Sequence, residues 1–153
     1  MRLMGRLTTH ALEIEEVTRQ IMRCQRRCGA VVSFLGVVRE DAHASHRVRA
    51  LIYEAYEEMA EAQLQHIIDE TARRWPIERV QVEHRLGRVE AGDVSVMVLV
   101  AAAHRAEAYA ASQYLLEGLK RDVPIWKREV YDDGTMRWSD GCAFVEEGSH
   151  AHV

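Results

Sequence analysis

The stretch that decides the fold runs from Gly118 to Glu129 and reads GLKRDVPIWKRE. Its proline, Pro124, has no backbone N–H to donate, and its ring disfavours the helical conformation at Val123. We therefore predict that a helix runs up to about Asp122 and ends there. The chain must change from helix to another conformation at this point.

The residues after the proline are predicted to form a strand. Residues 125–131 contain β-branched and aromatic side chains and lead into Asp133-Gly134, a favoured two-residue hairpin turn. Lys120 then projects from the last turn of the helix, and Lys127 projects from a strand that begins a few residues later. Both ammonium groups could therefore face one pocket, and a pocket with two lysines suits an anion.

Two interpretations of this cationic stretch are open. Crowding of like charges in a phosphate or carboxylate site lowers the pKa of a lysine toward the range useful in acid–base or acyl chemistry. Alternatively, the cations form a solvated basic edge, since positive charges at a helix C-terminus interact favourably with the helix dipole. Spacing alone favours the second interpretation, because charge runs at helix ends are common.

Length and composition predict one globular domain. The chain has 153 residues, of which 48% are hydrophobic and 29% charged, and a chain of this size buries about two thirds of the surface that its unfolded form exposes. We expect residues 1–140 to form a single domain and residues 141–153 to form a flexible tail. No apolar run is long enough to span a bilayer, so no membrane partner is expected.

Two further features indicate a cytoplasmic protein. Residues 1–6 lack the apolar segment of a signal peptide. The chain has three cysteines, and an odd number makes a secreted disulfide framework improbable.

The charge balance argues against a general nucleic-acid binder. The net charge is −4 and the isoelectric point is near 6.1, whereas nucleic-acid binders normally carry a basic surplus. Any anion site must therefore be local. This makes the cluster of Lys120, Arg121, Lys127 and Arg128 more informative than it would be in a basic protein.

No metal or cofactor site is expected. Cys24 and Cys28 lie in a predicted helix, without the tighter spacing in turns that structural zinc sites show. The loop that contains His43 and His46 offers no third clustered ligand. The sequence also has no Walker loop, dinucleotide-binding glycine motif or GxSxG nucleophile elbow.

The pattern of apolar residues predicts an α+β protein with a mainly antiparallel sheet and three helices. The predicted helices are 14–28, 57–75 and 105–122, and the predicted strands are 7–9, 30–39, 48–56, 79–86, 94–103, 125–131 and 135–139. Gly36 inside a buried strand predicts a bulge or a close approach by another part of the chain. Arg39 ends that strand, where it is either a binding residue on a rigid element or a plain strand-end arginine.

His104 and Arg105 open the helix that Lys120 nearly closes. The intervening residues, at 1.5 Å each, separate Arg105 from Lys120 by roughly 22 Å, so the two ends cannot share one small-molecule site within a single chain. Either His104 and Arg105 are unrelated to the lysines, or a second copy of the chain brings its helix start to this helix end. A twofold dimer would do this, and the shared site is our hypothesis.

Together these motifs resemble the large, catalytic subunit of molybdopterin synthase. The resemblance rests on 34–39 (FLGVVR), His104-Arg105, Lys120 and 124–129 (PIWKRE), in order and spacing, and covers residues 29–139. It implies an α/β-hammerhead type of fold and a homodimer flanked by two small ubiquitin-like sulfur-carrier subunits, a heterotetramer. That small partner carries a thiocarboxylate on its C-terminal glycine.

The resemblance also implies a reaction. The family is a sulfurtransferase of molybdenum cofactor biosynthesis that converts cyclic pyranopterin monophosphate, also called precursor Z, into molybdopterin. Sulfur from the partner forms the dithiolene, so the catalytic subunit needs neither a cysteine of its own nor a cofactor. The small-molecule substrate is therefore a pterin.

The family's site residues map onto matching positions of this chain. Lys120 and Lys127 are implied as catalytic residues that stabilise oxyanions and move protons. The implied substrate-binding residues are Val37, Val38, Arg39, His104, Arg105, Lys120, Lys127, Arg128 and Glu129. Strand alternation nevertheless sends Arg128 to the face opposite Lys127 and Glu129.

One departure from the family and two alternative functions remain open. Relatives are expected to carry a further arginine a few residues past the position of Trp138, where this chain has Asp140, Gly141 and Cys142. One alternative is a non-enzymatic anion- or RNA-binding dimeric module that uses the same cations. The other is a scaffold that keeps the dimer and the partner surface but has lost catalysis.

Overall fold

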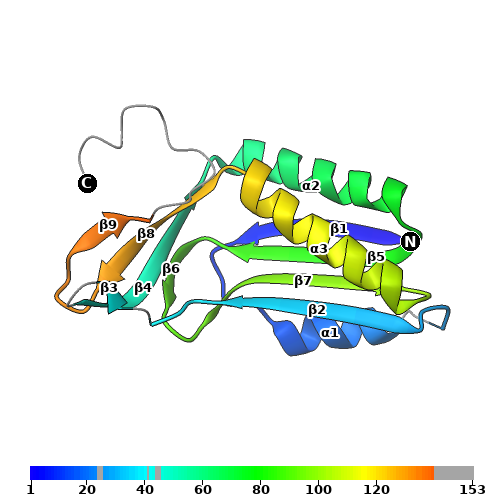
Figure 1. The fold of residues 1–153 in the computed structure, drawn as a ribbon, viewed down its shortest axis with the longest axis horizontal. Helices are drawn as coiled ribbons and strands as arrows, with labels where there is room; N and C mark the ends of the chain where they lie inside the picture. Colours follow the sequence, from blue (N-terminus) through cyan, green and yellow to red (C-terminus); the bar gives the residue numbers. More distant parts are fainter. Residues whose placement is uncertain (24–25, 41, 44–45, 140–153) are drawn as a thin grey trace.

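The chain folds into two β-sheets and three helices (Figure 1). The fold is that of a computed structural model, which describes residues 1–23, 26–40, 42–43 and 46–139. The helices are α1 (Ile14–Arg23), α2 (Glu57–Arg74) and α3 (Arg105–Asp122). The strands are β1 (Arg2–Thr8), β2 (Ala30–Val37), β3 (Ala42–His43), β4 (His46–Ala55), β5 (Ile77–Arg85), β6 (Gly87–Glu90), β7 (Val94–Ala102), β8 (Ile125–Tyr131) and β9 (Met136–Trp138). No helix among the described residues is long and apolar enough to cross a membrane.

The first sheet has the strand order β1-β5-β7-β2 and carries the helices. β1 pairs with β5 in parallel, whereas β7 pairs with β5 and β2 in antiparallel orientation. α2 and α3 cover one face of this sheet, and α1 covers part of the other (Figure 1). β7 is therefore buried on both faces: Val98 and Val100 pack under α2 and α3, whereas Met97 and Leu99 pack against α1.

α2 and α3 pack closely against each other because α3 has a glycine at the contact. A Cβ atom at Gly118 would lie 3.0 Å from Cγ2 of Ile67 in α2. Leu64 of α2 and Leu115 of α3 are almost fully buried in the same core. This packing holds the C-terminal end of α3 where the two sheets meet.

The second sheet has the strand order β3-β4-β8-β9, and β6 also pairs with β4. It lies at one end of the first sheet (Figure 1) and encloses a smaller core. That core contains Val38, Val48, Leu51, Val89 and Tyr131. The chain enters β8 of this sheet directly after α3, so Pro124 joins an element of the first layer to the second sheet.

The α+β class, the three helices and the mainly antiparallel pairing are confirmed. The strands form two sheets rather than one, α1 ends at Arg23 instead of residue 28, and β1 extends over Arg2–Thr8 instead of 7–9. The predicted loop around His43 and His46 contains the short strand β3. The predicted tail 141–153, Cys24 and the positions 140–142 lie outside the described residues.

Gly36 confirms both features that were predicted for it. The register between β2 and β7 shifts between Gly36 and Val37, which is a bulge. A Cβ atom at Gly36 would also collide with Cγ1 of Val96 on β7. The glycine therefore lets the end of β2 approach β7 closely and turn toward the second sheet.

Candidate active site

A cavity of about 650 Å³ lies where the two sheets meet. Its wall is built from the end of β2, the centre of β4, the end of β5, the start of β7, the last turn of α3, and β8 with β9. Elements from both sheets therefore contribute side chains to one space. A cavity of this size is within the range typical of small-molecule sites.

Lys120 and Lys127 both line this cavity. α3 ends at Asp122, and Val123 is extended, with φ −83° and ψ 123°. The backbone N–H of Val123 still donates to the carbonyl of Leu119 at 3.3 Å, which closes the last helical turn. β8 then begins at Ile125, so the proline break brings the two ammonium groups to the same cavity from different elements.

The end of β2 supplies Val37, Val38 and Arg39 to the wall. Val38 is buried, and its backbone is held on both sides by the turn before β7. Its N–H donates to the carbonyl of Asp93 at 3.0 Å, and its carbonyl accepts from the N–H of Gly92 at 2.8 Å. Arg39 is therefore an exposed cation directly after a residue whose backbone is held in place.

Glu129 lines the cavity, whereas Arg128 does not. A carboxylate oxygen of Glu129 accepts a hydrogen bond from the Tyr131 hydroxyl at 2.6 Å, and the other accepts from Ser139 Oγ at 3.3 Å. On the opposite face of β8, Nη2 of Arg128 lies 2.7 Å from Oε1 of Glu54. The strand alternation expected from the sequence is thus present.

His104 and Arg105 lie at the other end of α3 from Lys120, and neither lines the cavity of its own chain. His104 is the N-cap residue of the helix and Arg105 its first residue, and both side chains are exposed. Figure 1 shows α3 running diagonally across the sheet, so that its two ends lie far apart. The separation that the helix length predicted is therefore present within one chain.

His84 lines the cavity and was not singled out from the sequence. It is 8% exposed, and its Nδ1 atom lies 2.8 Å from the backbone carbonyl of Arg85. Burial is the main cause that lowers the pKa of His84 from 6.5 to about 4; the Arg85 carbonyl opposes this shift, and the charges of Lys120 and Lys127 add to it. The available signal was the alternation of β5, because Val80, Val82 and His84 occupy one face.

Tyr53, Arg137 and Ser139 also line the cavity and were missed. Arg137 adds a cation opposite Glu129, its partner in the β8–β9 register. With Arg39, Lys120 and Lys127 the wall carries four cationic side chains, against Glu129 and a neutral His84. The arrangement suits an anionic ligand, which the wall's guanidinium and ammonium groups can bind by charge-assisted hydrogen bonds.

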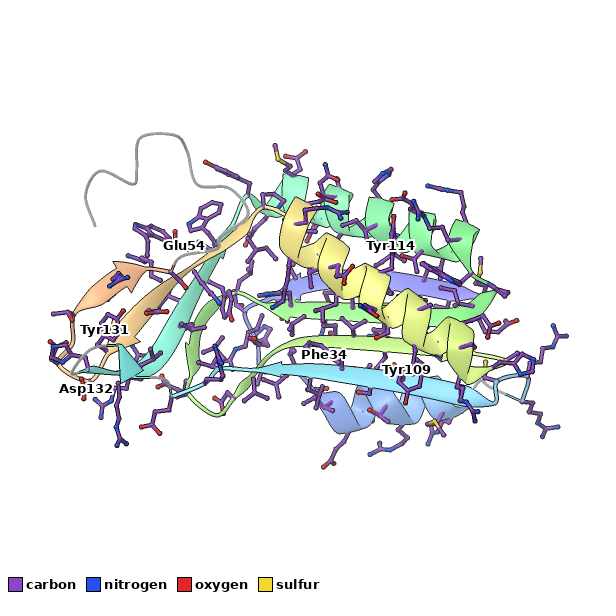
Figure 2. All side chains as sticks on the ribbon, in the orientation of Figure 1. Phe34, Glu54, Tyr109, Tyr114, Tyr131 and Asp132 are labelled. Atoms are coloured by element: carbon purple, nitrogen blue, oxygen red, sulfur yellow. The ribbon has the colours of Figure 1, made fainter. Side chains whose placement is uncertain are left out.

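One group of possible metal ligands exists among the described residues, and it lies outside this cavity. His46, Asp132 and Asp133 offer ligand atoms within 4.8 Å of one another. The His46 ring nitrogens lie 3.4 Å from Asp132 and 3.5 Å from Asp133, so the three residues already form ion pairs when the imidazole is protonated. Figure 2 shows Asp132 at the outer end of the second sheet. The sequence offered no third ligand beside His43 and His46, whereas the fold places two carboxylates beside His46.

The chain is similar to known proteins in both sequence and structure. The family model described as MoaE protein matches residues 7–122. The molybdopterin synthase catalytic subunit of Halalkalibacterium halodurans is 44% identical over 123 residues, which cover 80% of this chain and 77% of that protein. Molybdopterin synthase from Staphylococcus aureus has a similar structure, with a TM-score of 0.78 and 34% identity over 87% of this chain and 94% of that chain.

A further similar structure shows the fold alone. It comes from a protein–protein complex of subunits 1 and 2 of molybdopterin-converting factor from Helicobacter pylori. The TM-score is 0.76 at 20% identity, over 97% of this chain and 99% of that chain.

Proposed function

The chain belongs to the MoaE family of molybdopterin synthase catalytic subunits, enzymes of molybdenum cofactor biosynthesis, and from this premise we propose how its cavity works. The cavity binds cyclic pyranopterin monophosphate and admits the C-terminal thiocarboxylate of a small ubiquitin-like protein. Sulfur passes from that thiocarboxylate to the pterin and forms the dithiolene of molybdopterin.

The observation that carries this proposal is the convergence of Lys120 and Lys127 on one cavity. Both reactants are anions, one through its phosphate and the other through its thiocarboxylate. Arg39 and Arg137 on the same wall supply guanidinium groups, which suit phosphate oxygens. Two ammonium groups remain for the reacting centre.

Each sulfur transfer is proposed to proceed in two steps. The thiocarboxylate sulfur attacks a carbon of the pterin. The new carbon–sulfur bond replaces a carbon–oxygen bond, and the displaced oxygen leaves with a proton. A thioester then joins the two molecules. Water then attacks the thioester carbonyl, the acyl carbon–sulfur bond breaks, and the partner is released as a carboxylate. An ammonium group beside the carbonyl stabilises the tetrahedral oxyanion of the second step.

The proposed assembly contains two copies of this chain and two copies of the small partner. A protein–protein complex of subunits 1 and 2 is known for the molybdopterin-converting factor of Helicobacter pylori. In a twofold dimer, His104 and Arg105 of a second copy reach the cavity that they cannot reach in their own chain. A cytoplasmic location, expected from the sequence, remains a prediction.

The proposal is tested by mixing the purified protein with precursor Z and a thiocarboxylated ubiquitin-like partner, then measuring molybdopterin. Product is expected with the thiocarboxylate and not with the partner in its carboxylate form. Lys127→Ala should lower product formation by about a hundredfold or more, whereas Arg121→Ala, a change to the cation that follows Lys120 and pairs with Asp122, should not. A wild-type protein that forms no product where a known catalytic subunit does would overturn the proposal. Steeply salt-dependent RNA binding would then favour the alternative module.

A further inference from the structure

His84 belongs to the part of the first sheet that lies beneath the end of α3. On β5 it pairs in register with Val96 of β7, and Val96 shares a core with Leu119 of α3. Val96, Leu119, Lys120 and His84 all line the cavity. The imidazole therefore lies at the floor of the space into which the last turn of α3 projects Lys120.

The orientation of the imidazole is set by two neighbours. Nδ1 lies 2.8 Å from the carbonyl oxygen of Arg85. Because a carbonyl only accepts, Nδ1 carries the proton in this contact, and Nε2 bears the lone pair. The Tyr53 ring packs edge-on against the imidazole, with centroids 4.9 Å apart and an interplanar angle of 76°. Nε2 is thus the ring nitrogen left for a group in the cavity.

Charge gives this nitrogen a distinct role on the wall. A protonated His84 would add a fifth cation beside Arg39, Arg137 and the two lysines. Burial and the lysine charges instead keep the imidazole neutral, with its pKa at about 4. A neutral imidazole with its lone pair on Nε2 is a hydrogen-bond acceptor beside four cationic side chains that can only donate.

We propose that His84 is a positioning residue for catalysis, whose Nε2 accepts a hydrogen bond from the Lys120 ammonium group and aims that group at the reacting carbonyl. Lys120 is the partner of choice because the end of α3 lies over the β5–β7 pair that holds His84. Tyr53, which holds the imidazole, lies opposite Lys127 in the β4–β8 register. In this role His84 acts through Lys120 and does not itself take part in the reaction. The role rests on the function proposed above and adds a residue to it.

Two substitutions separate this role from a purely structural one. His84→Asn retains an N–H that can reach the Arg85 carbonyl but removes the acceptor at the position of Nε2. His84→Gln places an amide oxygen near that position and gives up the contact with Arg85. The matched control is His66→Asn, which changes an exposed histidine on α2.

The experiment compares steady-state kinetics of these variants with thiocarboxylated partner and precursor Z, together with thermal unfolding. We expect His84→Asn to lower kcat roughly ten- to a hundredfold, the effect of losing a hydrogen bond to a charged group. The KM for the pterin and the Kd for the partner should stay near the wild-type values. His84→Gln should recover part of the loss in kcat, although it retains less of the native backbone contact.

A second measurement does not depend on turnover. In protein labelled with ¹⁵N at the lysine ζ-nitrogen, the resonance of Lys120, assigned with Lys120→Arg, reports how fast the ammonium protons exchange with water. A hydrogen bond to an acceptor slows this exchange, so the exchange rate should rise in His84→Asn and not in His66→Asn.

Two outcomes would overturn the proposal. One is an unchanged kcat and an unchanged exchange rate of the Lys120 ammonium protons in His84→Asn. The other is equal loss of activity in His84→Asn and His84→Gln that follows the loss of thermal stability. If the wild-type protein forms no molybdopterin, the proposed function fails, and a Lys120 exchange rate that does not change in His84→Asn would separately reject the hydrogen bond.

Discussion

Lys127 and Arg128 are neighbours on β8, yet Lys127 lines the cavity whereas the Arg128 guanidinium lies on the other face, 5.2 Å from the centre of the Trp138 ring. Arg128 also pairs with Glu54, which in turn accepts a hydrogen bond from Trp126 Nε1 at 3.2 Å. Lys127 therefore faces the cavity, whereas Arg128 links β4, β8 and β9. The two neighbours offer a matched pair of substitutions.

We expect Lys127→Ala to lower molybdopterin formation by about a hundredfold or more, the effect of removing one donor to a developing oxyanion. Its unfolding free energy should stay close to that of the wild type. Arg128→Ala should lose about 1 kcal/mol or less of stability, because its ion pair with Glu54 is partly exposed. Its effect on turnover should be smaller than that of Lys127→Ala. Steady-state assays and urea titrations measure both, and the reverse order of activities would contradict the assignment.

The shared site in the dimer can be tested by mixing two inactive variants, His104→Ala and Lys120→Ala. Random exchange makes half of the dimers mixed, and each mixed dimer regains one intact site out of two. About a quarter of the wild-type activity should therefore return, since a twofold interface pairs the two contributions reciprocally. Each variant alone serves as the control. If activity stays at the level of the separate variants after subunit exchange is verified, His104 does not serve the partner's cavity.

The close approach at Gly36 predicts an overpacking penalty. Gly36→Ala places a methyl group against Val96 on β7 and should lower the unfolding free energy by about 1–3 kcal/mol. Val96→Ala removes the obstructing side chain, so the double variant should lose less stability than the sum of the single losses. Urea unfolding of the four proteins gives the coupling energy. Additive losses would mean that the strand moves away instead of meeting Val96.

The low pKa of His84 predicts a dependence of stability on pH. The unfolded histidine takes up a proton as the pH falls below 6.5, whereas the folded one resists until the pH reaches about 4. Stability is therefore full above pH 6.5 and declines across this window, by about 3 kcal/mol at its lower end.

Unfolding free energies at pH 7 and pH 4 measure this loss. In His84→Gln the loss between the two pH values should be smaller by the contribution of the missing imidazole. His66→Asn, at an exposed position, should retain the wild-type difference. Identical pH dependence in His84→Gln and wild type would show that other groups cause the decline.

The elements beside the cavity were predictable because local chemistry determines their ends. Pro124 stops α3, and the predicted range 105–122 matches Arg105–Asp122. The same break indicated that Lys120 and Lys127 could face one pocket, although spacing alone favoured a solvated basic edge, and the two residues line one cavity. Gly36 also predicted the bulge, because a glycine inside a buried strand often marks a bulge or a close approach by another backbone.

Features that depend on distant pairing were not predictable from periodicity. β1 carries Arg2 and Arg6 on a partly exposed edge strand, so its pattern is weak, and its parallel partner β5 lies more than seventy residues away in the register. Likewise, nothing local indicates that β4 pairs with both β6 and β8 and so forms a second sheet. Alternation predicted the two faces of each strand but not what each face would meet.

This limit explains why His84 was overlooked in the sequence. It follows Val80 and Val82 on the same face of β5, where a buried polar residue in an otherwise apolar row would have been a reasonable signal. The sequence does not show that the end of α3 lies over that row, which is what brings His84 and Lys120 to the same cavity. His104 and Arg105 show the opposite case, because helix length alone placed them away from Lys120.

Val123 and Pro124 connect α3 to β8, so the active site lies between the helical layer and the second sheet. Lys120 is anchored to the helical layer and Lys127 to the neighbouring sheet, so the gap between the two nitrogens follows the tilt of one layer against the other. Substitutions that alter this tilt, even in the hydrophobic core far from the cavity, should therefore lower turnover although no cavity residue has been replaced. Sequence drift in the interior of this enzyme is thus constrained by chemistry as well as by folding.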